Sequence, residues 1–177
     1  IFDIDIGEKA EISKIEFIGD KKIKDRKLRN IIVSEEGKFW KFISKNKFLN
    51  TSLIKRDKRL LKNFYLNMGY YDVQIESSTV DYFDDNTFKL TFQIDSGPKY
   101  IVNKASLELP IDYDIVNFKD VNKIIKSLNN ETYSFNKIAK VVEEIDKVSL
   151  SREYDFINAE IIENKTDDNK LNILFKV

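Results

Sequence analysis

The chain has 177 residues with no Cys and no His, and its 30 Lys and Arg are balanced by 30 Asp and Glu. The two missing residue types exclude disulfide frameworks, thiolate nucleophiles, Cys/His zinc sites and imidazole bases. With 42% hydrophobic residues the composition is that of a globular protein. We expect no enzyme activity, no catalytic residues, no cofactor and no metal.

A motif that occurs twice, 90 residues apart, indicates how the chain is divided. Phe2-Asp-Ile-Asp-Ile-Gly-Glu-Lys9 returns as Phe92-Gln-Ile-Asp-Ser-Gly-Pro-Lys99. In each copy an alternating strand ends at a glycine, which is typical of a joint between domains. The motif predicts the terminal strand of a preceding domain at residues 1–8, a whole domain at 9–97, and a second domain at 98–177 that stops at its last strand.

The first predicted domain begins with a strand that ends at Gly19-Asp20. Asp25 is expected to cap a short helix, because Leu28, Ile31 and Ile32 follow at helical spacing. A second, longer helix is predicted from the cap Asn50-Thr51 to Gly69, where a left-handed residue would end it.

A hairpin closes this domain. The first of its strands is predicted at Tyr71 to Tyr82 and the second at Phe88 to Ile94, because apolar and polar residues alternate in both.

The second predicted domain repeats the order strand, helix, helix, strand, strand. Its predicted features are a strand from Tyr100 to Leu109, a helix capped by Asn117, a break at Asn129-Asn130, a helix that begins at Ser134 or Asn136, and a hairpin with strands at Phe156 to Glu163 and Leu171 to Phe175.

These patterns predict an α+β fold in which two helices cover one face of a three-stranded mixed sheet in each domain. The first strand joins through the helical crossover, so it should run parallel to the last strand, which then lies in the middle. The first strand of each hairpin is left at the sheet edge.

This edge strand is the candidate partner-binding site of the first domain. An extended partner could add a strand to it by β-augmentation, in which main-chain hydrogen bonds provide the affinity. The alternative is an edge whose acidic residues Asp72, Glu76 and Asp81 keep it from pairing with anything. The candidate residues are Tyr71, Asp72, Val73, Gln74, Ile75, Glu76 and Ser77.

Between the two helices lies an aromatic loop that contains Phe39, Trp40, Phe42 and Ile43. It could be an exposed contact for a partner or a neighbouring domain. We favour the alternative, in which the loop folds back over the helices, because a domain of this size needs the buried area.

The segment from Lys21 to Lys62 carries 15 Lys and Arg against four acidic residues. It could attract nucleic acid, anionic lipid headgroups or acidic partner surfaces. We favour a solvated helical face. A nucleic-acid-binding αβ repeat is disfavoured, because only Gly37 lies between the helices where a KH domain needs two glycines.

Three motifs of the first predicted domain together resemble POTRA domains of BamA-type outer-membrane protein assembly factors. They are Ile15-Glu-Phe17-Ile-Gly19-Asp20, Phe64-Tyr65-Leu-Asn-Met-Gly69-Tyr70 and Phe92-Gln-Ile-Asp-Ser-Gly97. The aromatic loop is similar to the Trp-bearing loop of the third POTRA domain, so the resemblance suggests the third and fourth domains. Glu153 and Leu109-Pro110 depart from the pattern in the second domain.

The resemblance implies a periplasmic arm attached to a membrane β-barrel. Its implied partners are accessory assembly lipoproteins and unfolded outer-membrane protein clients, with no nucleic acid. The arm of a related secretion or translocation barrel protein is the alternative that this resemblance leaves open.

Overall fold

The computed structural model describes residues 10–37, 48, 50–82, 87–151, 159–166 and 168–177. The terminal strand expected at residues 1–8 lies outside this part. By their contacts the residues form two units. Unit 1 comprises Ile1–Phe64 and Val73–Gly97, and unit 2 comprises Tyr65–Asp72 and Pro98–Val177.

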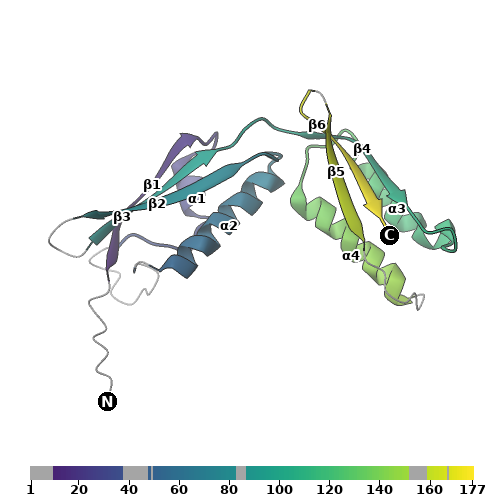
Figure 1. Cartoon of the computed structure of the whole chain (residues 1–177), viewed down its shortest axis with the longest axis horizontal. Helices are drawn as coiled ribbons and strands as arrows, with labels where there is room; N and C mark the ends of the chain where they lie inside the picture. The colour runs from purple at the N-terminus through teal and green to yellow at the C-terminus, as the bar shows by residue number, and fades with distance from the viewer. Residues whose placement is uncertain (1–9, 38–47, 49, 83–86, 152–158, 167) are drawn as a thin grey trace, which may run out of the picture. The chain divides into compact units, whose positions relative to one another are not determined.

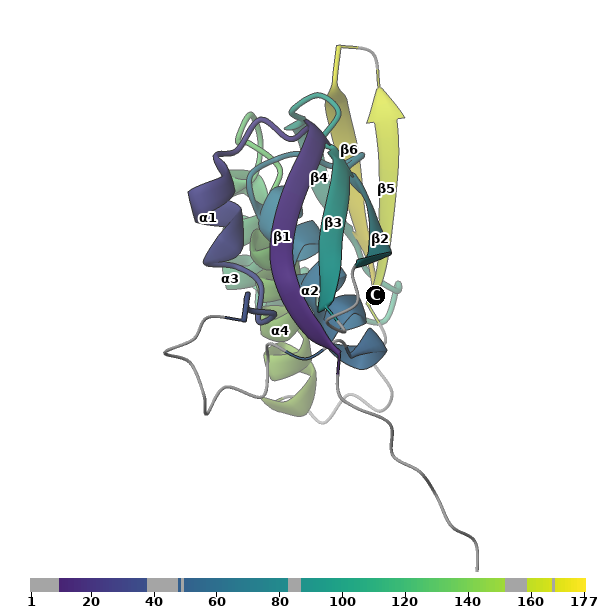
Figure 2. The same cartoon turned by 90° about the vertical axis from the view of Figure 1, so that its left-hand side faces the viewer.

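Unit 1 is built on a three-stranded sheet with the order β1-β3-β2. Strand β1 (Glu11–Asp20) runs parallel to β3 (Thr87–Asp95), and β2 (Gln74–Tyr82) runs antiparallel to it. Helices α1 (Asp25–Arg29) and α2 (Thr51–Asn67) lie on the same face of this sheet (Figure 1, Figure 2). The predicted topology is confirmed.

Alternating apolar residues of the strands fill the core of unit 1 beneath the helices. The rings of Phe17 and Phe92 stack with their centroids 5.6 Å apart. Leu28 from α1 and Leu61 from α2 are fully buried against this layer. The other buried apolar residues of the unit are Ile12, Ile15, Ile54, Val73, Ile75, Leu90 and Ile94. Burial of this apolar surface is what holds the two helices to the sheet.

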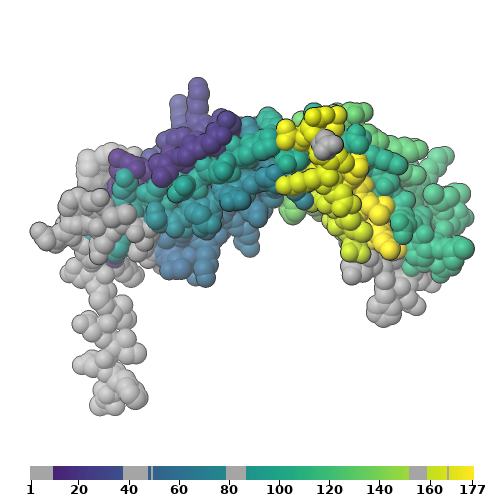
Figure 3. Space-filling view, turned by 45° about the horizontal axis from the view of Figure 1, so that its top comes forward, coloured from purple at the N-terminus to yellow at the C-terminus, as the bar shows by residue number. Residues whose placement is uncertain are grey.

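The opposite face of the sheet is polar, as expected for a sheet covered on one side only. Glu16 forms ion pairs with Lys14 (2.6 Å) and with Lys89 of the neighbouring strand (2.5 Å). Hydrogen bonds from Lys14 and Lys89 lower the pKa of Glu16 to about 2. In Figure 3 the atoms of β1, drawn in purple, lie at the surface of this unit.

Helix α2 has the two caps that its sequence predicts. The Asn50 side chain accepts hydrogen bonds from the backbone N–H of Ser52 (2.9 Å) and Leu53 (3.2 Å). At the other end Gly69 has a φ of +93°. The N–H of Tyr70 donates to the carbonyl of Tyr65 (3.0 Å), and the N–H of Gly69 to that of Leu66 (3.2 Å), which together form a Schellman motif.

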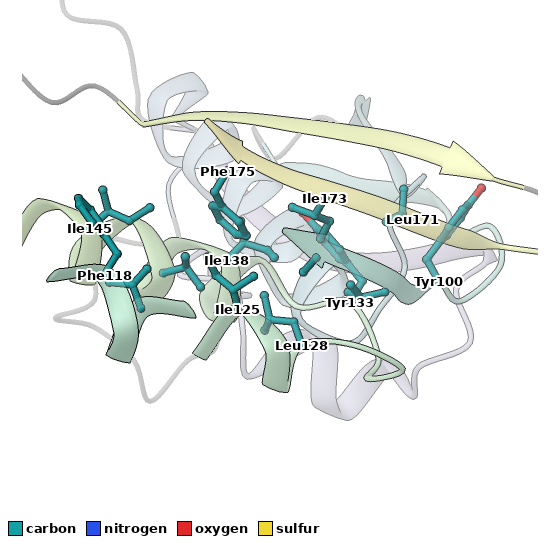
Figure 4. Close-up of a cluster of buried hydrophobic side chains, with 14 residues drawn as sticks. Tyr100, Phe118, Ile125, Leu128, Tyr133, Ile138, Ile145, Leu171, Ile173 and Phe175 are labelled. Atoms are coloured by element: carbon teal, nitrogen blue, oxygen red, sulfur yellow. The ribbon is translucent and has the colours of Figure 1, made fainter. Parts of the chain in front are cut away.

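Unit 2 has the same topology, with the sheet order β4-β6-β5. Its strands are β4 (Ile101–Glu108), β5 (Glu160–Thr166) and β6 (Lys170–Lys176), and its helices are the 3₁₀ helix η2 (Ile115–Phe118), α3 (Lys119–Ser127) and α4 (Phe135–Ser151). Figure 4 shows Leu171, Ile173 and Phe175 of β6 pointing toward the helices. All three are buried.

The end of α2 belongs to unit 2. The Asn67 side-chain oxygen accepts hydrogen bonds from the backbone N–H of Asn136 (2.7 Å) and the hydroxyl of Ser134 (3.1 Å), so it caps the start of α4. The carbonyl of Gly69 accepts from the N–H of Tyr100 (2.8 Å). These bonds make Tyr65–Asp72 an integral part of the second unit.

Three predicted element starts are wrong. Lys24, not Asp25, precedes α1, and this helix ends at Arg29 before Ile31 and Ile32. Asn117 lies inside η2, whose cap is Asp114, because the Asp114 side chain accepts from the N–H of Val116. Strand β2 begins at Gln74 instead of Tyr71.

Two other predicted features of unit 2 are confirmed. Ser134 directly precedes α4. The break at Asn129-Asn130 coincides with a left-handed residue, since Asn130 has a φ of +62°. Within the described ranges, no helix combines the length and the apolar character that crossing a bilayer requires.

Gly19→Ala tests the close approach of β1 to β3. Gly19 has a φ of +89°, and an added Cβ would collide with the backbone carbonyl oxygen of Ile94. We expect a loss of about 2 kcal/mol or more in the free energy of unfolding, measured by urea denaturation. Gly37→Ala is the control, because its Cβ would meet only the end of the Glu11 side chain. Equal losses in the two variants would contradict the backbone collision.

Candidate partner-docking edge

The sheet of unit 1 has two edges, and side chains close the edge formed by β1. The backbone N–H of Ile15 donates to the Glu36 carboxylate (2.9 Å), and the carbonyl of Ile15 accepts from the Arg29 guanidinium (2.5 Å). Arg29 and Glu36 also form an ion pair (2.5 Å). Together they take the place of a neighbouring strand at this residue.

Two further contacts occupy the same edge. The carbonyl of Ile12 accepts from the N–H of Gly37 (2.8 Å), and that of Phe17 accepts from the Lys21 ammonium (2.7 Å). Backbone groups along most of β1 are therefore already bonded, and this edge offers little to an incoming strand.

A buried carboxylate on α2 holds the loop that carries Glu36. Asp57 is 0% exposed, and it accepts hydrogen bonds from the backbone N–H of Val33 (2.7 Å) and Ser34 (3.1 Å). A buried carboxylate is stable only when such donors satisfy it. Asp57 thereby fixes the loop next to β1.

In unit 2 the outward backbone groups of the first strand, β4, are also hydrogen-bonded to other parts of the chain. The N–H of Ala105, which is 90 positions after Ile15, donates to the Asn129 side chain (2.7 Å). Val102 of the same strand bonds through its N–H to Glu131 (2.9 Å) and through its carbonyl to Asn130 (2.7 Å). In both units the segment after the first helix covers the first strand.

The orientation of β3 shows which backbone groups of β2 point outward. The N–H of Ser96, next after β3, donates to the carbonyl of Asp20 in β1 (3.0 Å). Backbone groups of successive strand residues point to opposite sides. Since Ser96 faces β1, Gln93 and Asp95 face β2.

Gln74 and Glu76 lie opposite these two residues and therefore bond to β3. Ile75 and Ser77 then turn their N–H and C=O groups away from the sheet. Among the described residues, no hydrogen bond reaches these outward groups. The edge of β2 is open where that of β1 is closed.

A shallow groove of about 390 Å³ runs beside this open edge. Lys58, Arg59 and Lys62 of α2 form one wall, and residues 73–76 form the other. Val73 and Ile75 are 4% and 8% exposed, so the groove has only a narrow apolar surface, which we call its apolar floor. Lys58 also forms an ion pair with Glu76 (3.0 Å).

The predicted site residues divide into three groups. Gln74, Ile75, Glu76 and Ser77 lie on β2, and Val73 is buried just before it. Tyr71 and Asp72 belong to unit 2 and are not part of the edge, which corrects the predicted strand. Phe39, Trp40, Phe42 and Ile43 lie outside the described residues, as does Glu153.

Tyr71 is instead part of a tyrosine cluster in unit 2. The hydroxyls of Tyr71 and Tyr133 both donate to the Glu163 carboxylate, at 2.9 and 3.0 Å. The two rings meet edge to face, with centroids 5.0 Å apart. Tyr100 donates to Asp72 (2.7 Å), and Asp72 is paired with Lys165. The alternating apolar and polar residues that predicted a strand from Tyr71 onward are explained at Tyr71 and Asp72 by their contacts in this cluster.

Burial raises the pKa of Tyr71 to about 12, and the bond to Glu163 adds to the shift. The pKa of Tyr133 is raised for the same two reasons. Both shifts favour the neutral phenol in the folded state. The cluster therefore acts as a structural anchor for Tyr65–Asp72 at neutral pH.

Residues 10–97 match the POTRA family model, which is described as a surface antigen variable number repeat. The chain is 26% identical over 176 residues to the outer membrane protein assembly factor BamA of Neisseria meningitidis, covering 96% of the chain and 22% of that protein. It is 26% identical over 172 residues to BamA of Buchnera aphidicola, covering 94% and 26%. The chain thus spans about a quarter of the length of these relatives.

Solved structures share the fold. The crystal structure of Haemophilus influenzae BamA POTRA3-5 superposes with a TM-score of 0.63 at 17% identity, over 95% of this chain and 61% of that one. BamA from Haemophilus ducreyi lacking POTRA domains 1-3 gives 0.62 at 12% identity, over 96% and 29%. POTRA1-2 of Omp85 from Anabaena gives 0.55 at 11% identity, over 96% of each chain.

Both units have the topology of POTRA domains, and residues 10–97, which make up most of the first predicted domain, belong to the POTRA family. The domains of this chain resemble those of BamA, the outer membrane protein assembly factor.

Glu36→Ala tests the closed edge of β1. It removes the acceptor of the buried Ile15 N–H, and we expect the free energy of unfolding to fall by about 1–3 kcal/mol. Glu36→Gln keeps an acceptor oxygen and should cost less. If urea denaturation gives equal losses, the ion pair with Arg29 and not the backbone bond is what stabilises the edge.

The tyrosine cluster makes unit 2 sensitive to high pH. Because the pKa of Tyr71 is raised from 10.0 to about 12, its contribution to stability is complete below pH 10 and is lost as the pH rises toward 12. In a titration followed by tyrosinate absorbance, Tyr71→Phe should remove a late-ionising group. Glu163→Gln should lower the pKa of Tyr71 only in part, because burial remains. Loss of an early-ionising group in Tyr71→Phe would contradict the assignment.

Proposed function

We propose that this chain is part of the periplasmic arm of a BamA-type assembly factor, attached in the full protein to a membrane β-barrel. In this role it scaffolds accessory assembly lipoproteins and guides unfolded β-barrel clients for folding and insertion into the outer membrane. The family match and the BamA relatives support the proposal.

The two domains expected from the sequence at residues 9–97 and 98–177 are proposed to be the third and fourth POTRA domains, preceded by the last strand of another at 1–8. The similarity of the aromatic loop to that of the third POTRA domain motivates this numbering, and the fold likeness to the Haemophilus influenzae structure supports a tandem of POTRA domains.

The observation that carries the docking role is the open edge of β2. Ile75 and Ser77 turn two N–H and two C=O groups away from the sheet, while side chains occupy the edge of β1. A partner in extended conformation could continue the sheet there by β-augmentation. Main-chain bonding is indifferent to side-chain sequence, which suits a receptor for many unfolded clients.

The strength of such binding follows from the number of bonds. Each backbone hydrogen bond contributes about 0.5–1.5 kcal/mol net, so four outward groups provide about 2–6 kcal/mol before the cost of ordering the partner. Taken alone, these bonds correspond to dissociation constants from about tens of micromolar to tens of millimolar. Weak binding of this kind lets a client be passed on.

Ser77→Pro tests the proposal directly. Proline removes one outward N–H but no bond to β3, so the sheet should stay folded by circular dichroism. We expect about two- to tenfold weaker binding of a fluorescent, urea-unfolded outer-membrane β-barrel protein, measured by anisotropy. Ser77→Ala keeps the N–H and is the control. Equal binding by a folded Ser77→Pro and by Ser77→Ala would refute docking at this edge.

A further inference from the structure

The groove beside β2 has a strongly one-sided charge. Arg59 and Lys62 are exposed on α2, and within the described part of the chain neither forms an ion pair. The only acidic residue of this helix is Asp57, which is fully buried and bonded to backbone N–H groups. No carboxylate of α2 is therefore left to neutralise the wall of the groove.

The pleat of β2 determines which side chains of an added strand would face this wall. Ile75 is buried beneath the helices, and Ser77 lies on the same face because it is two residues further along. Residues directly opposite each other in neighbouring strands point to the same face. Every second side chain of a strand added to β2 would therefore point toward Lys58, Arg59 and Lys62.

The pair formed by Lys58 and Glu76 shows that this wall reaches acids at the edge. Glu76 alternates with Ile75, so its side chain leaves the sheet on the opposite face, and this side chain is 80% exposed. Lys58 nevertheless extends from the helix side to within 3.0 Å of it. The contact thus joins α2 to the edge strand β2.

We infer that the strand bound at β2 is acidic, with Asp or Glu at the alternate positions that face α2. This inference rests on the proposed function and names the chemical class of its partner. Glutamate suits the site well, because its methylene groups can pack on the apolar floor at Ile75 while the carboxylate reaches Arg59 or Lys62. Backbone bonds would hold any strand, and the cations would select among strands.

Two strand-length synthetic peptides test the inference. They have the same Thr-rich sequence and differ only at alternate positions, which are Glu in one peptide and Lys in the other. A third peptide carries the Glu sequence with N-methylated backbone amides. Binding to the whole chain is measured by fluorescence anisotropy at low and high salt.

We expect the Glu peptide to bind about tenfold more tightly than the Lys peptide, and the difference to shrink at high salt. The double substitution Arg59→Glu with Lys62→Glu should abolish or reverse this preference. The matched control is Lys55→Glu with Arg56→Glu, which changes the net charge equally at exposed positions of α2 outside the groove. The control should keep the preference.

The outcomes separate the two proposals. If both peptides bind equally and N-methylation abolishes binding, strand addition stands and acidic selection is refuted. If neither peptide binds, the docking role and the acidic selection fail together. If the Arg59 and Lys62 substitutions weaken binding only to phosphatidylglycerol vesicles, the cations serve a lipid surface, and the inference is wrong.

Discussion

A three-stranded sheet always has two outer strands, and the outward backbone groups of each have no neighbouring strand to bond to. Whether other parts of the chain bond to these groups decides which edge of the sheet is open. In this chain the first strand of each unit is closed. Glu36 and Arg29 bond to Ile15 in unit 1, and Asn129 bonds to the corresponding Ala105 in unit 2. Among the described residues of unit 1, closing the edge of β1 leaves the edge of β2 as the side on which the sheet can accept another strand. This asymmetry is compatible with the docking role that we propose for β2.

The topology could be predicted from the sequence because it depends on local patterns. Alternating apolar and polar residues mark the strands of unit 1, and Asn50 and Gly69 mark the two ends of α2. The right-handed preference of crossover connections then leaves few possible topologies for these elements. The open edge of β2 follows from that topology alone. The sequence could therefore predict that the residues from Gln74 onward lie on an edge strand. It could not predict that Tyr71 and Asp72 belong to unit 2 instead.

The error at the start of β2 arises where a distant residue decides the local structure. Tyr71 alternates like a strand residue, but its partner Glu163 lies 92 positions away, and no local rule reports that bond. The role of Asp57 did leave a signal. It follows Ile54 by three positions and precedes Leu61 by four, so it lies on the buried stripe of a helix that is otherwise basic. An acid at such a position must have donors, and the sequence cannot say which.

The shared helix α2 has a consequence for how such domains can be exchanged between proteins. Most of α2 belongs to unit 1, yet Asn67 at its end caps α4, and Gly69 beyond it bonds to Tyr100. A gene segment cut at the sequence repeat, between Gly97 and Pro98, would deprive unit 2 of both contacts. The boundary marked by the sequence repeat therefore differs from the structural boundary of unit 2. Recombination that preserves a complete second domain must carry the last turn of the preceding helix with it.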